Sequence, residues 1–259
     1  MSYWQDRIAQ SQTKLTAKSL KQIQQQMRRY YSLAMTRTLE DFESTYNKLL
    51  ATIEDGKQPT PADLYKLDKY WQMQGQLRKE LQKLGERQVT ALSKIFEINF
   101  FDVYYSIGIE GAQAFNTITP EGATQLINAI WVADGKSWSQ RIWDNTNKLA
   151  DTLNEELINC VVRGKKTSEL KKVLQERFNV SYNSADSLAR TELAHVQTEA
   201  AKKRYEDYGV QQVQIWADPD ERTCEVCGEL HKKIYPVGAH VPIPAHPRCR
   251  CCIIPVVEK

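Results

Sequence analysis

Apolar side chains recur every three or four residues through most of the first hundred positions, as the buried stripe of an α-helix requires. One such run extends from about Ile23 to Ile53. The segment Thr60-Pro61-Ala62-Asp63 then supplies a hydroxyl cap, a proline for the first turn and a carboxylate that reaches back to the cap. Trp71 lies on the stripe that follows, which continues to about Tyr105. The sequence predicts two helices of roughly 40 residues, each about 60 Å long, in an elongated antiparallel hairpin or bundle.

The middle of the chain predicts shorter helices. Thr119-Pro120-Glu121 opens one, and Gly135–Ser137 opens another that runs to about Val162. A third begins at Thr167, and a fourth runs from about Asn183 to Tyr208 and stops at Gly209, the residue that most easily adopts the left-handed cap. Beyond this glycine the pattern becomes that of short strands near 210–216, 234–237 and 251–257, interrupted by prolines.

Composition is that of an ordinary folded chain. Of 259 residues, 41% are apolar and 26% charged, which excludes wholesale disorder. The apolar runs are too short to span a bilayer, and the polar start does not resemble a secretory signal, so we expect no membrane contact and a reducing cytoplasm. The net charge of +3 is too small to indicate nucleic-acid binding by itself.

Five of the six cysteines lie after residue 220, and four of the residues there form two close pairs. These are Cys224-Glu-Val-Cys227 and His246-Pro-Arg-Cys249. A two-residue gap lets both members of a pair face one ion, and thiolates with an imidazole suit a tetrahedral Zn²⁺. Four protein ligands leave no open position, so the spacing predicts a structural zinc that stabilises a β-segment with little apolar core.

The fourth ligand stays open at this point. Cys249 and Cys251 would face the same side of a strand, so Cys251 could replace His246 as the fourth ligand. Of the two, we favour His246. The predicted fold class is mainly α, with an elongated helical region at 1–115, a helical connector or core at 116–182, and an α+β end at 183–259 that closes in a zinc-stabilised β-rich cap.

Two stretches of the sequence resemble a known family. They are Trp216-Ala-Asp-Pro-Asp-Glu-Arg-Thr-Cys-Glu-Val-Cys227 and Pro242-Ile-Pro-Ala-His-Pro-Arg-Cys-Arg-Cys251, preceded by the helix Ala189-Arg-Thr-Glu192. They resemble the phage head-morphogenesis domain of the Mu F-like minor head proteins, over roughly residues 150–257. Two positions depart from that pattern: Ala217 stands where a hydroxyl is common, and His231 stands where glycine is usual.

The resemblance implies a minor structural protein of a tailed phage or prophage head that catalyses nothing. Its expected place is the capsid interior near the portal, with the portal protein as partner, and with scaffold, major capsid protein and double-stranded DNA as further possible partners. The implied roles are head assembly and DNA packaging or ejection. The resemblance also makes Arg190, Glu192, Asp218 and Arg222 candidates for a polar network between the last long helix and the zinc cap.

Basic residues form two candidate contact surfaces for DNA or a protein partner. The first follows one face of the first helix, at steps of three, four and seven residues: Arg7, Lys14, Lys18, Lys21 and Arg28. The second surrounds the turn before residue 167: Lys165, Lys166, Lys171 and Lys172. A plain solvated surface is the alternative for both.

Other functions have weaker support in the sequence. Glu192, His195 and Glu199 share a helix face, but a di-iron site needs a second Glu-x-x-His pair that the chain lacks, so a solvated or salt-bridged face is expected. A metal-dependent nuclease or a zinc-containing DNA-binding module remains the alternative function. Against the nuclease, no helix with a further histidine follows Cys249. Against the DNA-binding module, the second ligand pair lies in a proline-flanked turn and not on a helix that could enter the major groove.

Overall fold

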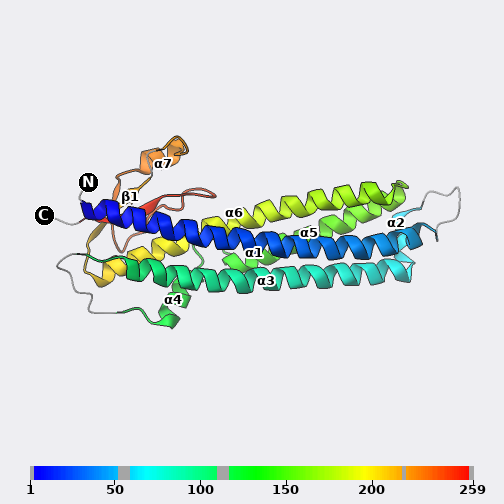
Figure 1. Ribbon diagram of the computed structural model, residues 1–259, viewed down its shortest axis with the longest axis horizontal. Helices are drawn as coiled ribbons and strands as arrows, with labels where there is room; N and C mark the ends of the chain where they lie inside the picture. Colours follow the sequence, from blue (N-terminus) through cyan, green and yellow to red (C-terminus); the bar gives the residue numbers. More distant parts are fainter. Residues whose placement is uncertain (1–2, 52–58, 110–116, 218–219, 257–259) are drawn as a thin grey trace. The chain divides into compact units, whose positions relative to one another are not determined.

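The computed structural model describes residues 3–51, 59–109, 117–217 and 220–256, and most of them lie in helices (Figure 1). The elements are α1 (Tyr3–Leu50), α2 (Pro61–Tyr65), α3 (Asp68–Ser106), α4 (Pro120–Ile127), α5 (Trp138–Val162), α6 (Thr167–Asp207), β1 (Gln212–Trp216), α7 (Glu225–Leu230), β2 (Ile234–Pro236) and β3 (Cys252–Val256). The two long N-terminal helices contain 48 and 39 residues. The predicted helical chain with a small sheet near its C-terminus is therefore confirmed.

The chain forms two compact units that each combine separated stretches of sequence. The helical unit comprises residues 25–90 and 139–186, and the sheet unit comprises 1–24, 91–138 and 187–259. The helices α1, α3 and α6 contribute residues to both. The predicted domain boundaries after 115 and 182 follow the order of the chain, and they stay a prediction.

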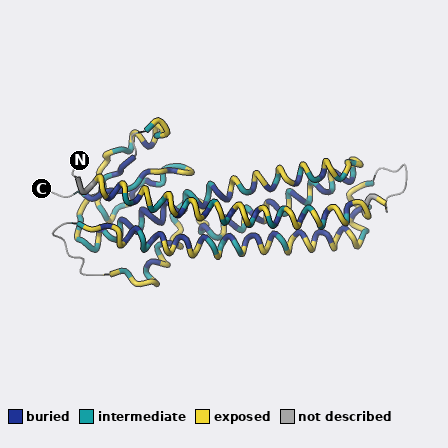
Figure 2. Tube along the Cα trace, viewed as in Figure 1, coloured by how far each residue is buried: buried dark blue, intermediate teal, exposed yellow. Residues whose placement is uncertain are grey.

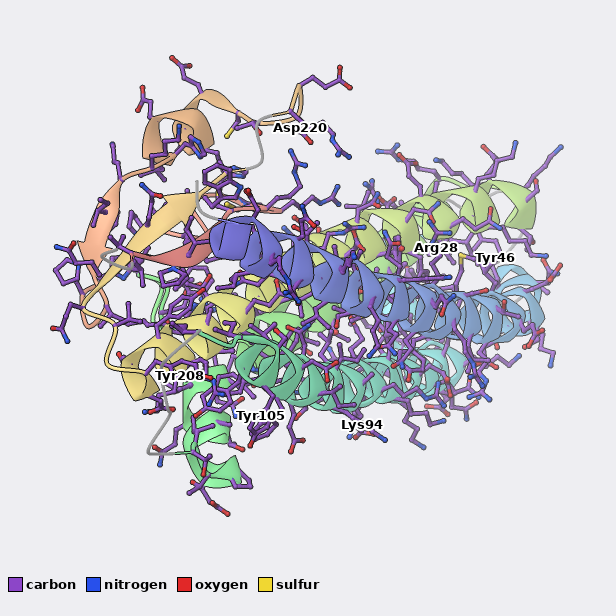
Figure 3. The ribbon with its side chains drawn as sticks, turned by 60° about the vertical axis from the view of Figure 1, so that its left-hand side comes forward. Arg28, Tyr46, Lys94, Tyr105, Tyr208 and Asp220 are labelled. Atoms are coloured by element: carbon purple, nitrogen blue, oxygen red, sulfur yellow. The ribbon has the colours of Figure 1, made fainter. Side chains whose placement is uncertain are left out.

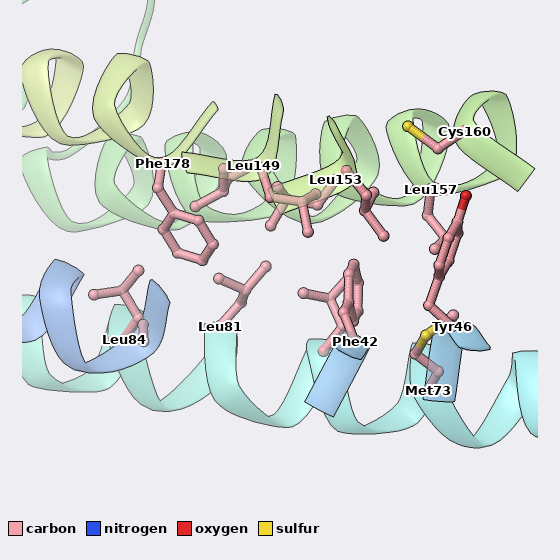
Figure 4. Packing of buried hydrophobic residues seen from close by; sticks show 14 of the residues in the cluster. Phe42, Tyr46, Met73, Leu81, Leu84, Leu149, Leu153, Leu157, Cys160 and Phe178 are labelled. Atoms are coloured by element: carbon pink, nitrogen blue, oxygen red, sulfur yellow. The ribbon is translucent and has the colours of Figure 1, made fainter. Parts of the chain in front are cut away.

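The helical unit is built around one apolar core. Each of its four long helical segments contributes buried side chains, among them Phe42 of α1, Leu81 of α3, Leu153 of α5 and Phe178 of α6 (Figure 4). Buried and exposed positions alternate along each segment, as helical periodicity requires (Figure 2). Tyr46 lies at one end of this core, where its hydroxyl donates to the carbonyl of Lys165 at 2.8 Å.

The start of α3 differs from the sequence prediction. The helix that Thr60 caps ends after one turn, at Tyr65, and α3 begins anew at Asp68. Residues Tyr70 and Met73 are buried, whereas Trp71 is 56% exposed and donates from its indole to the carbonyl of Tyr65 at 2.8 Å. Tyr70, Met73 and Leu77 share the buried face of α3, and Trp71 lies about 100° around the helix from Tyr70, so Trp71 does not belong to the core.

The third and fourth predicted helices are one helix. α6 runs unbroken from Thr167 to Asp207, and one face of the polar stretch near Ser181 is buried, whereas Val180 and Ser184 are exposed. Phe178 and Ala185 are buried in the helical core, and the Ser181 carbonyl accepts from Asn145 at 3.1 Å. No proline or glycine interrupts these 41 residues, so the local polarity did not end the helix.

The sheet unit contains a three-stranded antiparallel sheet in the order β2-β1-β3. β1 lies at its centre, and Val213 pairs with Tyr235 on one side and Pro255 on the other. The chain enters the sheet through Gly209, whose φ of +72° permits the predicted left-handed cap. Tyr205 of α6 then donates to the carbonyl of Ile253 at 3.0 Å, which fixes β3 against the helix.

Within the described residues, no helix has both the length and the apolar character that crossing a bilayer requires.

Candidate metal centre

The first cysteine pair is held by a short helix that the sequence did not predict. Cys224 is the N-cap of α7, and Cys227 lies in its first turn. The backbone N–H of Cys227 points to Sγ of Cys224 at 3.5 Å. One turn of helix therefore places both sulfurs on the same side, as the two-residue spacing requires.

The second pair is held by a tight turn in the loop before β3. The N–H of Cys249 donates to the carbonyl of His246 at 3.1 Å, and Arg248 between them has a φ of +62°. Nδ1 of His246 lies 2.9 Å from the carbonyl of Pro247. A carbonyl only accepts, so Nδ1 carries the proton and Nε2 is left with the lone pair that a metal needs.

These two turns bring the pairs together. Nε2 of His246 lies 3.2 Å from Sγ of Cys224 and 3.1 Å from Sγ of Cys227. Sγ of Cys227 lies 3.8 Å from Sγ of Cys249. Two thiolates on one tetrahedral zinc are about 3.8 Å apart when each Zn–S bond is about 2.3 Å. The residues thus fit a metal ion of that size and geometry.

The ligand atoms form two groups of three that share Cys227. One group is Cys224, Cys227 and His246, the other is Cys227, Cys249 and Cys251, and the ligand atoms in each lie within 4.8 Å of one another. This cluster of cysteines with a histidine could hold a metal ion. It includes every predicted ligand and also the alternative, so Cys251 remains a candidate.

The pKa values of the thiols differ with their surroundings. The N–H of Cys227 lowers the pKa of Cys224, whereas burial raises the pKa of Cys227 to about 12. A hydrogen bond from the Cys251 thiol lowers the pKa of Cys249 to about 5 and raises the pKa of Cys251 itself. Cys224 and Cys249, one from each pair, are therefore the thiols that ionise most easily.

Asp220, labelled in Figure 3, forms ion pairs with Arg222 and Arg250. Its carboxylate accepts from Arg250 at 2.6 and 2.8 Å and from Arg222 at 3.0 Å. Arg250, followed by Arg222, keeps the pKa of this carboxyl well below its ordinary value. Because Arg250 lies between Cys249 and Cys251, the ion pairs tie the loop before α7 to the second ligand pair.

The four residues of the predicted polar network have different surroundings. Arg222 pairs with Asp220, and Arg190 lines the same cavity as Arg222. Glu192 is 3% exposed and accepts from the indole of Trp131 at 2.9 Å. Asp218 lies outside the described residues, so the network as a whole stays a prediction.

The face of α6 that we expected to be solvated or salt-bridged is buried at Glu192 and His195 and half-buried at Glu199. His195 is 6% exposed, and its ring stacks on Trp131 at a centroid distance of 4.5 Å. The tryptophan belongs to the segment before α5, which the sequence did not connect with this face. Glu192 and His195 therefore pack against Trp131, which explains their burial.

The two departures from the family pattern meet in space. The N–H of Ala217 donates to Nδ1 of His231 at 3.2 Å, and the histidine ring lies 4.4 Å from that of Trp216. A histidine here thus joins the ends of β1 and α7. The sequence contained both residues but no signal that they are neighbours.

The predicted basic surfaces are mostly exposed. In the sheet unit Arg7, Lys14, Lys18 and Lys21 are exposed on α1, and Lys18 pairs with Asp102 at 3.3 Å. In the helical unit Arg28 is exposed and donates to the hydroxyl of Tyr182 at 3.3 Å.

The second basic surface belongs to the helical unit. Lys166 and Lys172 are exposed, Lys171 pairs with Glu43, and Lys165 is half-buried. These positions are compatible with a partner contact, and the role of each residue stays a prediction.

Comparison with known proteins agrees with the resemblance. Residues 151–254 match the model of the family described as phage Mu protein F like protein. One similar protein is the NAD(+)--arginine ADP-ribosyltransferase EFV of Enterococcus faecalis, which is 29% identical over 151 residues. That match covers 51% of this chain and 31% of the relative, so the chain spans about a third of the relative's length. No solved structure matches.

The matched region runs from α5 to β3 and includes all five candidate ligands. Members of this family are structural proteins of phage heads. Residues 151–254 of this chain belong to the phage Mu protein F-like family.

Proposed function

We propose that this protein is a minor structural component of a tailed phage or prophage head that associates with the portal. It acts in head assembly and in DNA packaging or ejection, and it catalyses no reaction. The observation that carries the proposal is the match of residues 151–254 to the family. In this region Nε2 of His246, from the second ligand pair, lies within 3.2 Å of both sulfurs of the first pair. During assembly the protein is in the host cytoplasm, and afterwards in the virion, inside the capsid near the portal.

A structural Zn²⁺ is part of the proposal. Cys224, Cys227, His246 and Cys249 would hold it, with Cys251 as the alternative to His246. The ion would join α7 to the loop before β3, two segments with little apolar core of their own. Bound there, it contributes folding free energy and leaves no open coordination position for chemistry.

Double-stranded DNA is the second proposed partner. Lys14 and Lys21 are exposed and lie on one face of the helix. Lysines that neutralise DNA phosphates release the counterions bound there, so the affinity for DNA would fall steeply as the salt concentration rises. Lys18 is a weaker candidate because Asp102 offsets its charge. The acidic surface of a portal, scaffold or major capsid protein is the alternative partner for the same residues.

The portal association is tested with the portal protein encoded in the same phage genome. We expect the two proteins, produced together, to elute as one complex and the minor protein to be present in purified virions. Absence from virions that contain the portal would contradict the proposal.

The DNA contact is tested by gel shift of linear double-stranded DNA over a salt series, with and without Mg²⁺. Lys14→Gln and Lys21→Gln should each weaken the shift and reduce its salt dependence, whereas Lys94→Gln should not. Lys94 is a matched control because it is exposed on α3 and outside the predicted surface (Figure 3). Metal-dependent DNA fragments would instead support the nuclease alternative.

The ADP-ribosyltransferase activity named for the relative is not proposed for this chain. The match covers only 31% of that protein, so its activity does not carry over to this chain. Incubation with NAD⁺ and an arginine-rich protein should leave that protein unmodified.

A further inference from the structure

Beside the candidate metal centre, the sheet unit contains a cavity of about 410 Å³. α1 and α6 form part of its wall, and the segment 248–252 forms another part. Its volume is within the range of about 300–1,000 Å³ that is usual for sites that bind small molecules. A group of nucleotide size can enter such a cavity, whereas a DNA duplex cannot.

The cavity has a concentrated positive charge. Four arginines line it: Arg190, Arg222, Arg248 and Arg250. None of the other described residues that line it is acidic. Asp220, which pairs with Arg222 and Arg250, offsets one charge.

Asp220 also orients two of these guanidinium groups. It accepts two hydrogen bonds from Arg250, at 2.6 and 2.8 Å, and a further one from Arg222 at 3.0 Å. A guanidinium has five N–H donors, so one carboxylate does not exhaust it. Fixed arginine forks of this kind match the oxygens of a phosphate group, which accepts several bidentate pairs.

The remaining wall offers a polar and an apolar part. Gln197 is 8% exposed, its Oε1 accepts from Thr16 at 2.8 Å, and its Nε2 has no hydrogen-bond partner among the described residues. Ala17, Leu20 and Ala194 supply aliphatic surface. An amide donor and an aliphatic wall suit the sugar and base that accompany a phosphate.

We propose that this cavity binds a nucleoside 5′-phosphate, with the four arginines around the phosphate and the aliphatic wall against the nucleoside. The ligand is either a free nucleotide or the phosphorylated end of a DNA strand, because both present the same chemistry. The proposal does not depend on the phage-head assignment, and its test needs no head or portal.

The test is calorimetric titration of the full zinc-loaded chain with deoxyadenosine 5′-monophosphate. We expect one saturable site per chain, and no binding of deoxyadenosine, which lacks the phosphate. Arg248→Gln and Arg222→Gln should each weaken binding by about tenfold or more, since each removes a charged hydrogen-bonding partner. Lys94→Gln, which makes the same change of charge at an exposed site on α3, should leave the affinity unchanged.

A second measurement requires no variant. Inorganic phosphate should displace the nucleotide from the wild-type protein, and sodium chloride at equal ionic strength should not. Displacement by a 5′-phosphorylated oligonucleotide, but not by its 5′-hydroxyl form, would assign the site to a DNA end, and displacement by neither would assign it to a free nucleotide. Absence of saturable binding, or equal affinities in wild type and both arginine variants, would overturn the proposal.

Discussion

Sγ of Cys227 lies 3.1 Å from Nε2 of His246, although 19 positions separate the two residues. Two local structures produce this proximity: the first turn of α7 and the tight turn that ends at Cys249. The sheet supplies the rest, because β1 pairs with both β2 and β3 and so brings the flanking segments to one end. The ligand pairs are thus positioned by backbone structure that surrounds them on both sides.

Removal of the Cys227 thiol should abolish metal binding. Cys227 belongs to both groups of neighbouring ligand atoms, so Cys227→Ser disrupts the centre whichever fourth ligand it uses. We expect about one zinc per chain in the wild type and none in the variant, together with a lower thermal midpoint. Elemental analysis of the dialysed proteins measures the zinc.

Cys252→Ser is the matched control for that experiment. Cys252 lies on β3 beside Cys251 but belongs to neither group of ligand atoms. It should retain the zinc content of the wild type. Full zinc content in Cys227→Ser would rule out the proposed centre.

The fourth ligand can be assigned with cobalt in place of zinc. The intensity of the thiolate-to-cobalt absorption follows the number of thiolates bound. With His246 as ligand, Cys251→Ser should leave the spectrum unchanged, and His246→Ala should lower the metal affinity. A loss of thiolate absorption in Cys251→Ser would make Cys251 the fourth ligand instead.

Two glycines of α3 should respond to alanine in opposite ways. A Cβ at Gly85 would overlap the ring of Trp143, whereas nothing lies within 4 Å of a Cβ at Gly75. Gly85→Ala should therefore destabilise the protein by about 1–3 kcal/mol, as overpacking does. Gly75→Ala should stabilise it by up to about 1 kcal/mol, because alanine loses less backbone entropy in a helix.

Urea unfolding of both variants measures the two free energies. The comparison is internally controlled, since both changes add one methyl group to the same helix of the helical unit. If both variants were stabilised, α3 and α5 would not approach each other closely at Gly85.

Local signals in the sequence predicted most of the fold. Thr60, Thr119 and Gly209 act as the caps that their residue types indicate. Periodicity failed where tertiary packing decided the outcome. Trp71 lies off the buried face of α3 that Tyr70 and Met73 share, and α6 continues past Ser181, which packs in the helical unit on one face only.

The candidate site was predictable only in part. Paired cysteine and histidine spacing names the ligands, because each pair is local. The arginine-lined cavity joins α1, α6 and the segment 248–252, which are far apart in the sequence, so no spacing signals it. The contact between Ala217 and His231 likewise depends on the pairing of β1 and β2, which brings the two residues together.

His231 should make stability depend on pH. Burial lowers the pKa of its ring, and the neutral ring accepts the N–H of Ala217 through Nδ1. A protonated ring cannot accept. Because the pKa is lower in the folded state than its ordinary value of about 6.5, the contribution is fully present above that pH and is lost as the pH falls through the folded value.

His231→Ala tests this dependence. The variant should be less stable than the wild type by about 1 kcal/mol at pH 7.5, the usual worth of one hydrogen bond. The difference should shrink as the pH falls below about 6.5, because the wild type then loses the same interaction. Denaturant unfolding of both proteins at each pH cancels the titration of the metal ligands, which the two share. A difference that stays constant between pH 7.5 and pH 5 would mean that the histidine stabilises the end of β1 through its contact with Trp216 and not through Nδ1.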